Sequence, residues 1–149
     1  MKVTIVSGCV ATGKTTYAKR LAKRTGAVYV DGSLIIKRYP VCVGYDRKRR
    51  CKIVDTDKLN RVLLRLIKAS KKDLVIDSHL AHYLFPKAVD LCVITICSNL
   101  KELARRLQKR GYAKGKVEEN LEAEIMEVCL QEAHERGHNV RVVDTARKF

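Results

Sequence analysis

The sequence predicts an α/β fold in which a five-stranded parallel sheet carries helices on both faces. Short β-branched segments alternate along the 149 residues with longer segments whose apolar residues recur at helical spacing. The segment Leu74–Ile76 is apolar throughout, as expected of a strand that is covered on both faces. A glycine-containing loop lies between the first strand and the first helix. In such three-layer folds the ligand binds at the carboxyl ends of the strands.

The loop Gly8–Thr15 has the pattern G-x-x-x-x-G-K-T, the phosphate-binding loop (P-loop) of enzymes that use nucleoside triphosphates. Its glycines let backbone N–H groups turn inward around a phosphate chain. The ammonium group of Lys14 reaches the β- and γ-phosphates, and the hydroxyl group of Thr15 holds Mg²⁺. The sequence therefore predicts a P-loop NTPase fold that binds ATP with Mg²⁺.

The segments on either side of the loop agree with this prediction. Lys2–Val6 is a β-branched run typical of a buried strand. Lys14–Thr25 is expected to form a helix that ends at Gly26, and the start of this helix favours an anion. The apolar residues on one face of this helix are Tyr17, Ala18, Leu21 and Ala22.

The next part of the chain contains a long insertion between expected strands. A second strand at Ala27–Val30 leads into Asp31, and a short helix around Leu34–Ile36 stops before Pro40. The following segment, residues 41–52, is expected to be irregular and basic. An enzyme that moves phosphate between nucleotides would hold its acceptor in this insertion, which spans about residues 31–57, whereas a simple ATPase needs no such insertion.

The rest of the chain continues the alternation of helices and strands. A long helix is expected after a cap at Asp55, Thr56 or Asp57, with Leu59, Val62, Leu63, Leu66 and Ile67 on one face. The later expected elements are a strand at Asp73–Asp77, a strand at Ala88–Ile96, a helix that is capped by Asn99 and ends at Arg110–Tyr112, a helix at Val117–Arg136 that is stopped by Gly137, and a strand at Asn139–Val143. The last helix is expected to turn Leu121, Ile125, Val128 and Cys129 inward.

Size and composition restrict the class of protein. The length suits one domain over residues 1–149. No apolar stretch reaches the length of a membrane span and no signal peptide precedes the first strand, so a cytoplasmic location is expected. The net charge is +15, with a local basic run at 46–50. Such a charge fits contact with nucleic acid, a ribosome or another polyanion, and it fits equally a basic surface that confers solubility or tolerance of heat or salt.

The six cysteines do not indicate a disulfide framework in a cytoplasmic protein. Cys92, Cys97 and Cys129 fall in strand or helix patterns, where small buried thiols are ordinary. Cys42 and Cys51 are nine residues apart without a C-x-x-C pattern or a histidine pair, which argues against a zinc site. A disulfide between these two cysteines stays open.

Polar residues at the end of the expected third strand are candidates for catalysis. Asp77 lies at the carboxyl edge of the sheet, where an acidic residue positions Mg²⁺ directly or through water. A strand-end aspartate that caps the next turn is the structural alternative. His79, two residues later, is expected either to orient a water molecule or sense the γ-phosphate as a neutral imidazole, or to serve as a structural hydrogen-bonding group.

Arginines near the end of the fourth expected helix suit phosphoryl transfer, which depends on positioning and on neutralising charge. Arg106 and Arg110 are four residues apart and share a helix face, whereas Arg105 is expected to be solvated. The segment Gly111–Gly115, with a glycine at each end, is either a short mobile lid or an ordinary turn between helices.

Several motifs together resemble adenylate kinase isoenzyme six, the nuclear adenylate kinase/ATPase family of eukaryotes and its archaeal counterparts. The motifs are Lys14-Thr15-Thr16, Tyr45-Asp46, Ile53–Asp57, Asp77-Ser78-His79, Arg110-Gly111-Tyr112, Glu119-Asn120 and Ala123-Glu124-Ile125. The resemblance covers nearly the whole chain. The P-loop alone is shared by many folds, whereas the combination of Asp-x-His with Arg-Gly-Tyr and Glu-Asn is far more specific.

The resemblance implies a nucleoside monophosphate kinase fold with a monophosphate-binding insertion and a short lid at about 110–117. It implies the reaction ATP + AMP ⇌ 2 ADP with broad nucleotide tolerance, together with ATPase activity. It also implies a partner, the ribosomal protein universal small-subunit eleven, and a role with pre-ribosomal RNA in maturation of the small subunit.

The resemblance extends to individual residues. Gly8, Gly13, Lys14, Thr15 and Thr16 match the P-loop of the family, and Arg106 and Arg110 match its arginines at the lid edge. The residues expected to bind the nucleotide are Gly8, Ala11, Thr12, Gly13, Lys14, Thr15, Thr16 and Arg106. Lys14, Asp77, His79 and Arg110 would serve catalysis, and Ser33 and Arg38 would contact the acceptor. One departure concerns Ala11, where the family commonly has glycine, so this position must avoid a backbone conformation that only glycine adopts.

Two alternatives remain beside the kinase interpretation. The protein could be an assembly factor in which ATP hydrolysis acts on a ribosomal protein–RNA complex and kinase activity is incidental. It could also be a small-molecule kinase of the shikimate or cytidylate kinase type, which shares the first strand, loop and helix.

Overall fold

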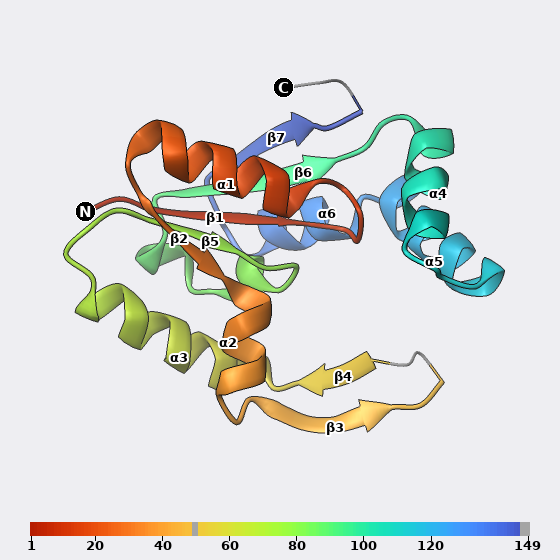
Figure 1. The fold of residues 1–149 in the computed structure, drawn as a ribbon. Coiled ribbons are helices and arrows are strands. Elements are labelled where there is room, and N and C mark those ends of the chain that lie inside the picture. Colours follow the sequence, from red (N-terminus) through yellow and green to blue (C-terminus); the bar gives the residue numbers. More distant parts are fainter. Residues whose placement is uncertain (49–50, 147–149) are drawn as a thin grey trace.

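The computed structural model describes residues 1–48 and 51–146. In this part of the chain, five parallel strands form one sheet in the order β2-β5-β1-β6-β7. The strands are β1 (Val3–Gly8), β2 (Val28–Asp31), β5 (Leu74–Asp77), β6 (Leu91–Ile96) and β7 (Val140–Asp144). The predicted α/β fold with a five-stranded parallel sheet is confirmed (Figure 1).

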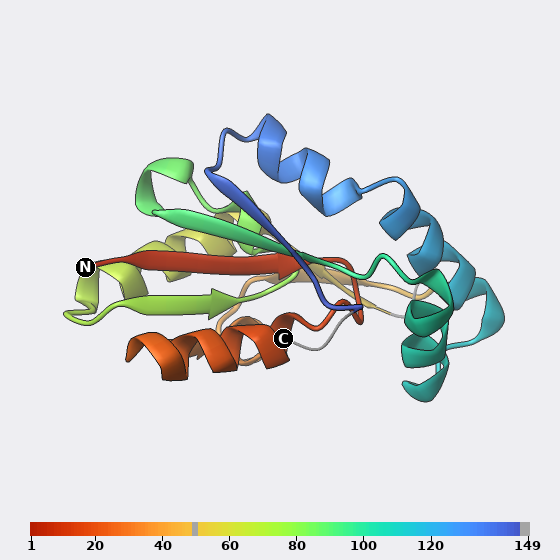
Figure 2. The same ribbon diagram turned by 90° about the horizontal axis from the view of Figure 1, so that it is seen from above.

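Helices cover both faces of the sheet (Figures 1 and 2). Helix α1 (Lys14–Thr25) packs Ala18 and Ala22 against one face. On the other face, α3 (Thr56–Ala69) and α6 (Val128–Glu135) pack on a larger core. The other helical segments are α2 (Gly32–Arg38), α4 (Leu100–Lys109), α5 (Lys114–Ile125) and the 3-10 turns η1 (Ala81–Tyr83) and η2 (Pro86–Ala88). No helix in the described ranges is long and apolar enough to cross a membrane.

The helix ends follow the predicted signals. Helix α1 ends at Gly26, whose φ of 72° is the left-handed conformation that glycine adopts without strain. Asp55 caps α3 by accepting from the backbone N–H groups of Asp57 and Lys58, at 3.0 and 3.2 Å. Asn99 caps α4 by accepting from the N–H group of Glu102 at 3.1 Å. The fourth strand begins at Leu91 rather than at Ala88, because a 3-10 turn occupies residues 86–88.

The sequence pattern predicts that the segment 41–52 is irregular. This prediction is wrong, because the segment contains most of an antiparallel hairpin. Strands β3 (Cys42–Asp46) and β4 (Cys51–Val54) pair with each other and not with the main sheet, from which the hairpin projects (Figure 1). Both strands are largely exposed and can therefore carry charged residues. These charged residues mask the alternation that is typical of a strand. Arg49 and Arg50 of the basic run lie outside the described residues.

The hairpin register separates the two cysteines that the sequence leaves open to a disulfide. Cys42 is opposite Val54, and Cys51 is opposite Asp46, at the other end of the ladder. Four residues along a strand span about 13 Å. A disulfide needs Cα atoms within about 7 Å, so this register does not allow one between Cys42 and Cys51.

The single helix predicted for Val117–Arg136 is two helices, α5 and α6. Glu127, between them, has a φ of 52°, which reverses the local handedness and ends the first helix at Ile125. Helix α5 packs against α4, whereas α6 packs against the sheet, so one straight helix cannot serve both surfaces. The prediction that Ile125 and Val128 face inward is therefore wrong, since they are 60% and 38% exposed.

Candidate active site

The P-loop lies at the carboxyl end of β1, and close packing of its backbone requires glycine at Gly8. A Cβ atom there would lie 2.5 Å from the carbonyl oxygen of Thr95 on β6, at a φ of 147°. Gly13 has a φ of 83° and precedes the first residue of α1. The hydroxyl group of Thr12 donates to the carbonyl oxygen of Cys9 at 2.7 Å and lies 2.8 Å from the hydroxyl group of Thr95. These contacts hold the loop in a tight turn before α1.

Ala11 occupies the position where the family that this sequence resembles commonly has glycine. Its φ is 64°, in the left-handed region. An L-residue can enter this region at a cost of about 1–2 kcal/mol, so the conformation is strained but not restricted to glycine. The side chain is buried against α4 and α5, and the carbonyl oxygen accepts from Arg106 Nη1 at 3.2 Å. Packing and this hydrogen bond stabilise the strained position.

Lys14 begins α1 and points back into the loop. Its Nζ atom donates to the carbonyl oxygen of Cys9 at 2.8 Å. Desolvation lowers the pKa of Lys14, and the nearby guanidinium group of Arg110 lowers it further, while Asp77 acts in the opposite direction. A cation that is poorly solvated attracts a polyphosphate strongly, because the anion replaces the missing solvent.

Thr15 and Asp77 meet at the edge of the sheet. The Thr15 hydroxyl group donates to Asp77 Oδ2 at 2.7 Å, and the Tyr29 hydroxyl group donates to the same oxygen at 2.7 Å. Desolvation and the bond to Asp77 raise the pKa of Tyr29, which keeps it protonated as a donor. Asp77 itself is 5% exposed. The strand-end carboxylate therefore faces the P-loop hydroxyl group, and a magnesium site between them stays a prediction.

The donors in this corner fit Mg²⁺. This ion takes oxygen ligands and is commonly held by one or two protein side chains together with substrate phosphates and water. Thr15 and Asp77 supply one hydroxyl and one carboxylate oxygen at contact distance. The described residues contain no group of three or more His, Cys, Asp or Glu side chains that could hold a metal on their own. A metal in this corner would therefore depend on the nucleotide for part of its coordination.

A close backbone approach brings the second strand beside Asp77. Asp31, at the end of β2, is the register partner of Asp77. A Cβ atom on Gly32 would lie 2.5 Å from Ser78 Cβ and 2.6 Å from the carbonyl oxygen of Asp77, so only glycine fits. The candidate acceptor residue Ser33 follows, and its hydroxyl group donates to Asp31 Oδ1 at 2.9 Å.

The second candidate acceptor residue, Arg38, is exposed in the last turn of α2. Ser33, near the start of α2, is also exposed. A cavity beside the P-loop is bordered by the arginines of α4, and neither Ser33 nor Arg38 lines it. The two candidates thus share one helix at the sheet edge that holds Asp77.

His79 follows Asp77 at this edge and is exposed. Desolvation of its ring and the positive charge of Lys14 lower its pKa, so the imidazole is neutral near pH 7. Its carbonyl oxygen lies 3.2 Å from the buried hydroxyl oxygen of Ser7. The chain after β5 is thereby tied to β1, one residue before the P-loop.

The arginines of α4 border a cavity of about 620 Å³ beside the P-loop. Its lining includes Ala11, Gly13, Thr16, Glu102, Arg105, Arg106, Lys109, Arg110 and Thr145. Arg106 also bonds to the carbonyl oxygen of Thr145 at 2.8 Å and to Glu102 at 3.2 Å. Arg110 is exposed, and exposed Arg105 pairs with Glu102 at 2.6 Å. The structure thus brings both predicted arginines, Arg106 and Arg110, beside the loop. Gly111–Ala113 form the turn between α4 and α5.

A buried network behind the loop has no counterpart in the sequence prediction, which gave His82 no role. His82 is 2% exposed, with Nδ1 2.7 Å from Ser7 Oγ and Nε2 3.0 Å from Glu132 Oε2. Burial lowers the pKa of His82 despite the opposing effect of Glu132, so the ring is neutral near pH 7. Because a carboxylate only accepts, Nε2 donates to Glu132 and Nδ1 accepts from Ser7. Separations of 75 and 50 residues leave no local signal for this network.

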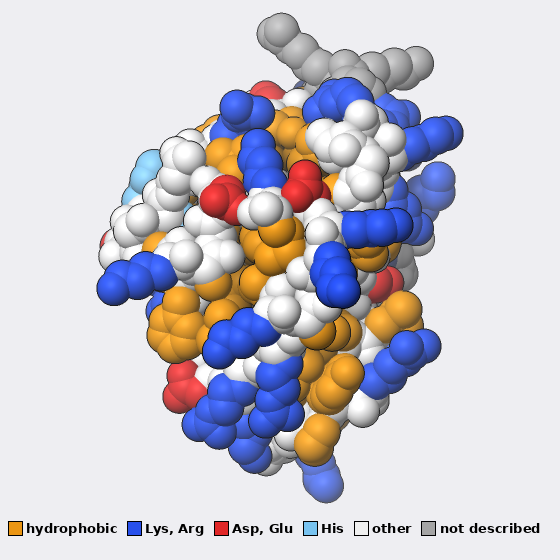
Figure 3. All heavy atoms as spheres, turned by 90° about the vertical axis from the view of Figure 1, so that its left-hand side faces the viewer, with side chains coloured by type: hydrophobic (Ala, Val, Ile, Leu, Met, Phe, Trp, Pro, Cys, Tyr) orange, Lys and Arg blue, Asp and Glu red, His pale blue; other side chains and the backbone are white. Residues whose placement is uncertain are grey.

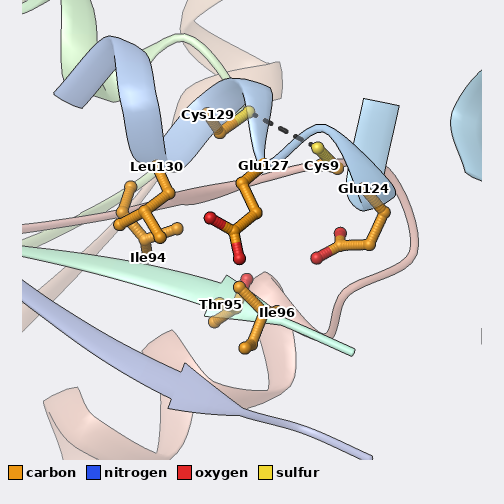
Figure 4. Close-up of a pocket in the computed structure, with 8 residues that line it drawn as sticks. All are labelled: Cys9, Ile94, Thr95, Ile96, Glu124, Glu127, Cys129 and Leu130. Atoms are coloured by element: carbon orange, nitrogen blue, oxygen red, sulfur yellow. Dashed lines mark hydrogen bonds between the residues drawn. The ribbon is translucent and has the colours of Figure 1, made fainter. Parts of the chain in front are cut away.

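Two thiols also meet at the loop. The sulfur atoms of Cys9 and Cys129 are 3.8 Å apart, and a small cavity beside them is bordered by the carboxyl groups of Glu124 and Glu127 (Figure 4). Glu124 is buried, and desolvation raises its pKa. The sequence pattern treats Cys129 as an ordinary buried thiol, whereas it is half-buried and contacts the P-loop.

The fold and the loop define the class: an α/β protein whose P-loop joins the first parallel strand to the first helix. A family model described as an AAA domain matches residues 5–127. The shikimate kinase from Acinetobacter baumannii, solved in complex with shikimate, superposes with a TM-score of 0.65 over 99% of this chain and 86% of that one. At 12% identity, this similarity shows the fold alone.

Relatives of higher identity define the family. The protein named "Putative adenylate kinase" of Thermococcus kodakarensis is 38% identical over 144 residues, which are 96% of this chain and 76% of the relative. The "Adenylate kinase isoenzyme 6 homolog" of Schizosaccharomyces pombe is 35% identical over 132 residues, which are 88% of this chain and 73% of the relative. The chain belongs to the adenylate kinase isoenzyme 6 family, which confirms the resemblance seen in the sequence.

Proposed function

We propose that the protein is a nucleoside monophosphate kinase that transfers the γ-phosphoryl group of ATP to AMP and forms two molecules of ADP, with tolerance for other nucleotides. The observation that carries the proposal is the 2.7 Å contact between the Thr15 hydroxyl group and Asp77 at the P-loop. This contact joins the two protein oxygens that an Mg²⁺–ATP site needs. Relatives named as adenylate kinases support AMP as the acceptor.

Each proposed catalytic residue has an electrostatic task. Backbone N–H groups of the loop bind the phosphate chain, and Lys14, Arg106 and Arg110 neutralise charge as the phosphoryl group moves. Mg²⁺ bound with ATP would neutralise phosphate oxygens, held by Thr15 and, through water, by Asp77. Lys14 must leave the Cys9 carbonyl oxygen, its partner at 2.8 Å, to reach the β- and γ-phosphates. No covalent phospho-enzyme is required.

The acceptor would bind over the insertion at about residues 31–57, with contacts from Ser33 and Arg38. The start of α2 beside Asp77 supports this assignment, because it lies across the sheet edge from the P-loop. The turn within residues 110–117 would close over the donor nucleotide and exclude water, which otherwise takes the phosphoryl group.

We also propose ATP hydrolysis as a second activity, with His79 orienting the attacking water. Its neutral ring and its position two residues after Asp77 suit that task. In the alternative function, hydrolysis serves assembly of a ribosomal protein–RNA complex, and the proposed partner is the ribosomal protein universal small-subunit eleven. The net charge of +15 is compatible with a polyanionic setting, and Lys and Arg side chains spread over the face in Figure 3 with few acidic ones.

The kinase proposal is tested by supplying ATP and Mg²⁺ with and without AMP and measuring ADP and inorganic phosphate separately. We expect saturating AMP to increase ADP formation without phosphate release. If inorganic phosphate stays the dominant product at saturating AMP, the assembly ATPase becomes the better function. Binding of the purified ribosomal protein, measured at rising salt concentrations, tests the partner.

The variant Asp77→Asn tests the carrying observation. We expect turnover to fall roughly 100-fold, as for groups that orient metal ligands. Asp73→Asn is the matched control, because Asp73 lies just before the same strand, at the opposite edge of the sheet. Equal activity in the two variants would contradict the proposed role of Asp77.

A further inference from the structure

The P-loop of this chain carries a thiol that faces a second thiol from a distant part of the sequence. Cys9 is the residue after Gly8, and Cys129 is the second residue of α6, 120 positions later. Their sulfur atoms are 3.8 Å apart, and both residues are partly accessible to solvent. Figure 4 shows the two side chains pointing toward each other from the loop and the helix.

We propose that Cys9 and Cys129 form a redox modification site, in which a reversible disulfide fixes the P-loop to α6 and prevents ATP binding. A disulfide needs the sulfurs at about 2 Å, so they must approach by roughly 1.8 Å. The start of α6 is the natural place for this shift, because Glu127 immediately before it is the left-handed break between two helices. The inference about ATP rests on the P-loop and not on the identity of the acceptor.

The surroundings favour Cys9 as the attacking thiol. The hydrogen bond between the two thiol groups lowers the pKa of Cys9, and the positive charge of Lys14 acts in the same direction, while burial and Glu124 oppose them. The Cys129 pKa is raised by the same pairing with Cys9 and by burial. The low-pKa, partly accessible thiol is the one that reacts with a small oxidant, and its neighbour then resolves the product.

The oxidant is a low-molecular-weight disulfide, RSSR. The Cys9 thiolate attacks one sulfur atom, which forms a mixed disulfide and releases RS⁻, and RS⁻ takes up the proton that Cys9 lost. Cys129 then attacks the Cys9 sulfur, loses its proton to the second departing RS⁻, and closes the protein disulfide. Two protein thiols are oxidised, and RSSR is reduced to two RSH.

The bond would act on the loop at the residue that Lys14 contacts. Lys14 Nζ donates to the carbonyl oxygen of Cys9, so a shift of Cys9 toward α6 moves the partner of the phosphate-binding ammonium group. Displacements of about 1 Å in a catalytic site can reduce rate by roughly 100-fold. The oxidised protein is therefore expected to lose ATP binding and turnover together, and to regain both on reduction.

The test uses oxidised glutathione on the purified chain, with mapping of linked peptides by mass spectrometry and ATP binding by calorimetry. We expect a Cys9–Cys129 linkage, a loss of ATP affinity of at least about tenfold, and full reversal with dithiothreitol. Excess ATP should slow the linkage, since the two states exclude each other. The Cys42→Ser variant is the control and should still form the linkage, because its exposed thiol lies on the hairpin.

The variants Cys129→Ser and Cys129→Ala should show no internal linkage after the same treatment with oxidised glutathione. The absence of a linkage in the parent protein overturns the proposed site. A linkage that leaves ATP affinity unchanged overturns its proposed effect. Neither readout uses AMP, so failure here is distinct from failure of the kinase function.

Discussion

Removal of the Glu132 carboxylate should destabilise the protein through the buried network behind the P-loop. Glu132 accepts from His82 Nε2 at 3.0 Å and also from the Tyr83 hydroxyl group. Desolvation alone would raise the pKa of Glu132, but these two hydrogen bonds and the nearby positive charge of Arg136 together outweigh it and lower the pKa. In Glu132→Ala, the His82 ring stays buried with a donor that has lost its acceptor.

The size of the effect follows from burial. An unsatisfied buried donor costs about 1–3 kcal/mol, and a hydrogen bond to a charged group contributes about 1.5–3 kcal/mol. Because Glu132 is 30% exposed and Tyr83 can bond to water, the loss at His82 dominates. We therefore expect the free energy of unfolding to fall by about 2–3 kcal/mol. For a chain of this size, that corresponds to a Tm decrease of roughly 4–12 °C.

The matched control is Glu135→Ala, an exposed glutamate in the same helix. Both variants gain the same helix propensity, so the difference between them isolates the network. Urea unfolding followed by circular dichroism measures both free energies. If Glu132→Ala lies within about 0.5 kcal/mol of the control, the usual range for surface changes, then the network does not stabilise the fold.

Three further outcomes are expected. Gly32→Ala should lower stability by about 1–3 kcal/mol in thermal unfolding and should reduce turnover, because its Cβ atom would press on the Asp77 carbonyl oxygen at 2.6 Å. Arg106→Ala should raise the KM for ATP roughly tenfold or more, since a charge-assisted contact to the loop is lost. Burial lowers the pKa of His82 and His138, so the unfolded chain binds more protons than the folded chain. The free energy of unfolding should therefore be highest above about pH 6.5 and fall toward about pH 5. Urea midpoints measured across this range test the expectation.

The main sheet was predictable because its strands carry local signals. The segments around Ile5 and Ile76 are apolar and β-branched, and the helices between strands have clear caps at Gly26, Asp55 and Asn99. The break at Glu127 had no such signal, because no glycine, proline or asparagine marks it. Tertiary packing of α5 and α6 on different surfaces overrides the continuous helical pattern there.

The β3–β4 hairpin did carry a signal. Val41, Val43 and Tyr45 alternate with small or polar residues, which is the period of a strand. The basic residues at its tip obscured this alternation. Because the hairpin stays largely exposed and pairs only with itself, hydrophobic burial does not reinforce the pattern. Prediction of such a hairpin depends on its two strands being considered as a pair.

Some parts of the candidate site could be predicted from the sequence and others could not. The loop motif and Asp77 could be located from the sequence, because a strand end and a helix start position them locally. The partners of the loop could not, since Cys129, Thr145 and the His82 network reach it across most of the chain. Spacing along the sequence contains no information on such contacts unless the order of strands is known.

These distant partners hold the P-loop at separate points. The Thr145 hydroxyl group donates to the carbonyl oxygen of Thr12 at 2.7 Å, Arg106 bonds to that of Ala11, and Ser7 joins the strand before the loop to His82. The loop therefore keeps its strained Ala11 without the glycine that would relax it. Since the supports come from residues 82–145, changes far from the nucleotide should alter its binding through the loop conformation. The P-loop motif supplies the phosphate-binding groups, and the second half of the chain determines how they are held.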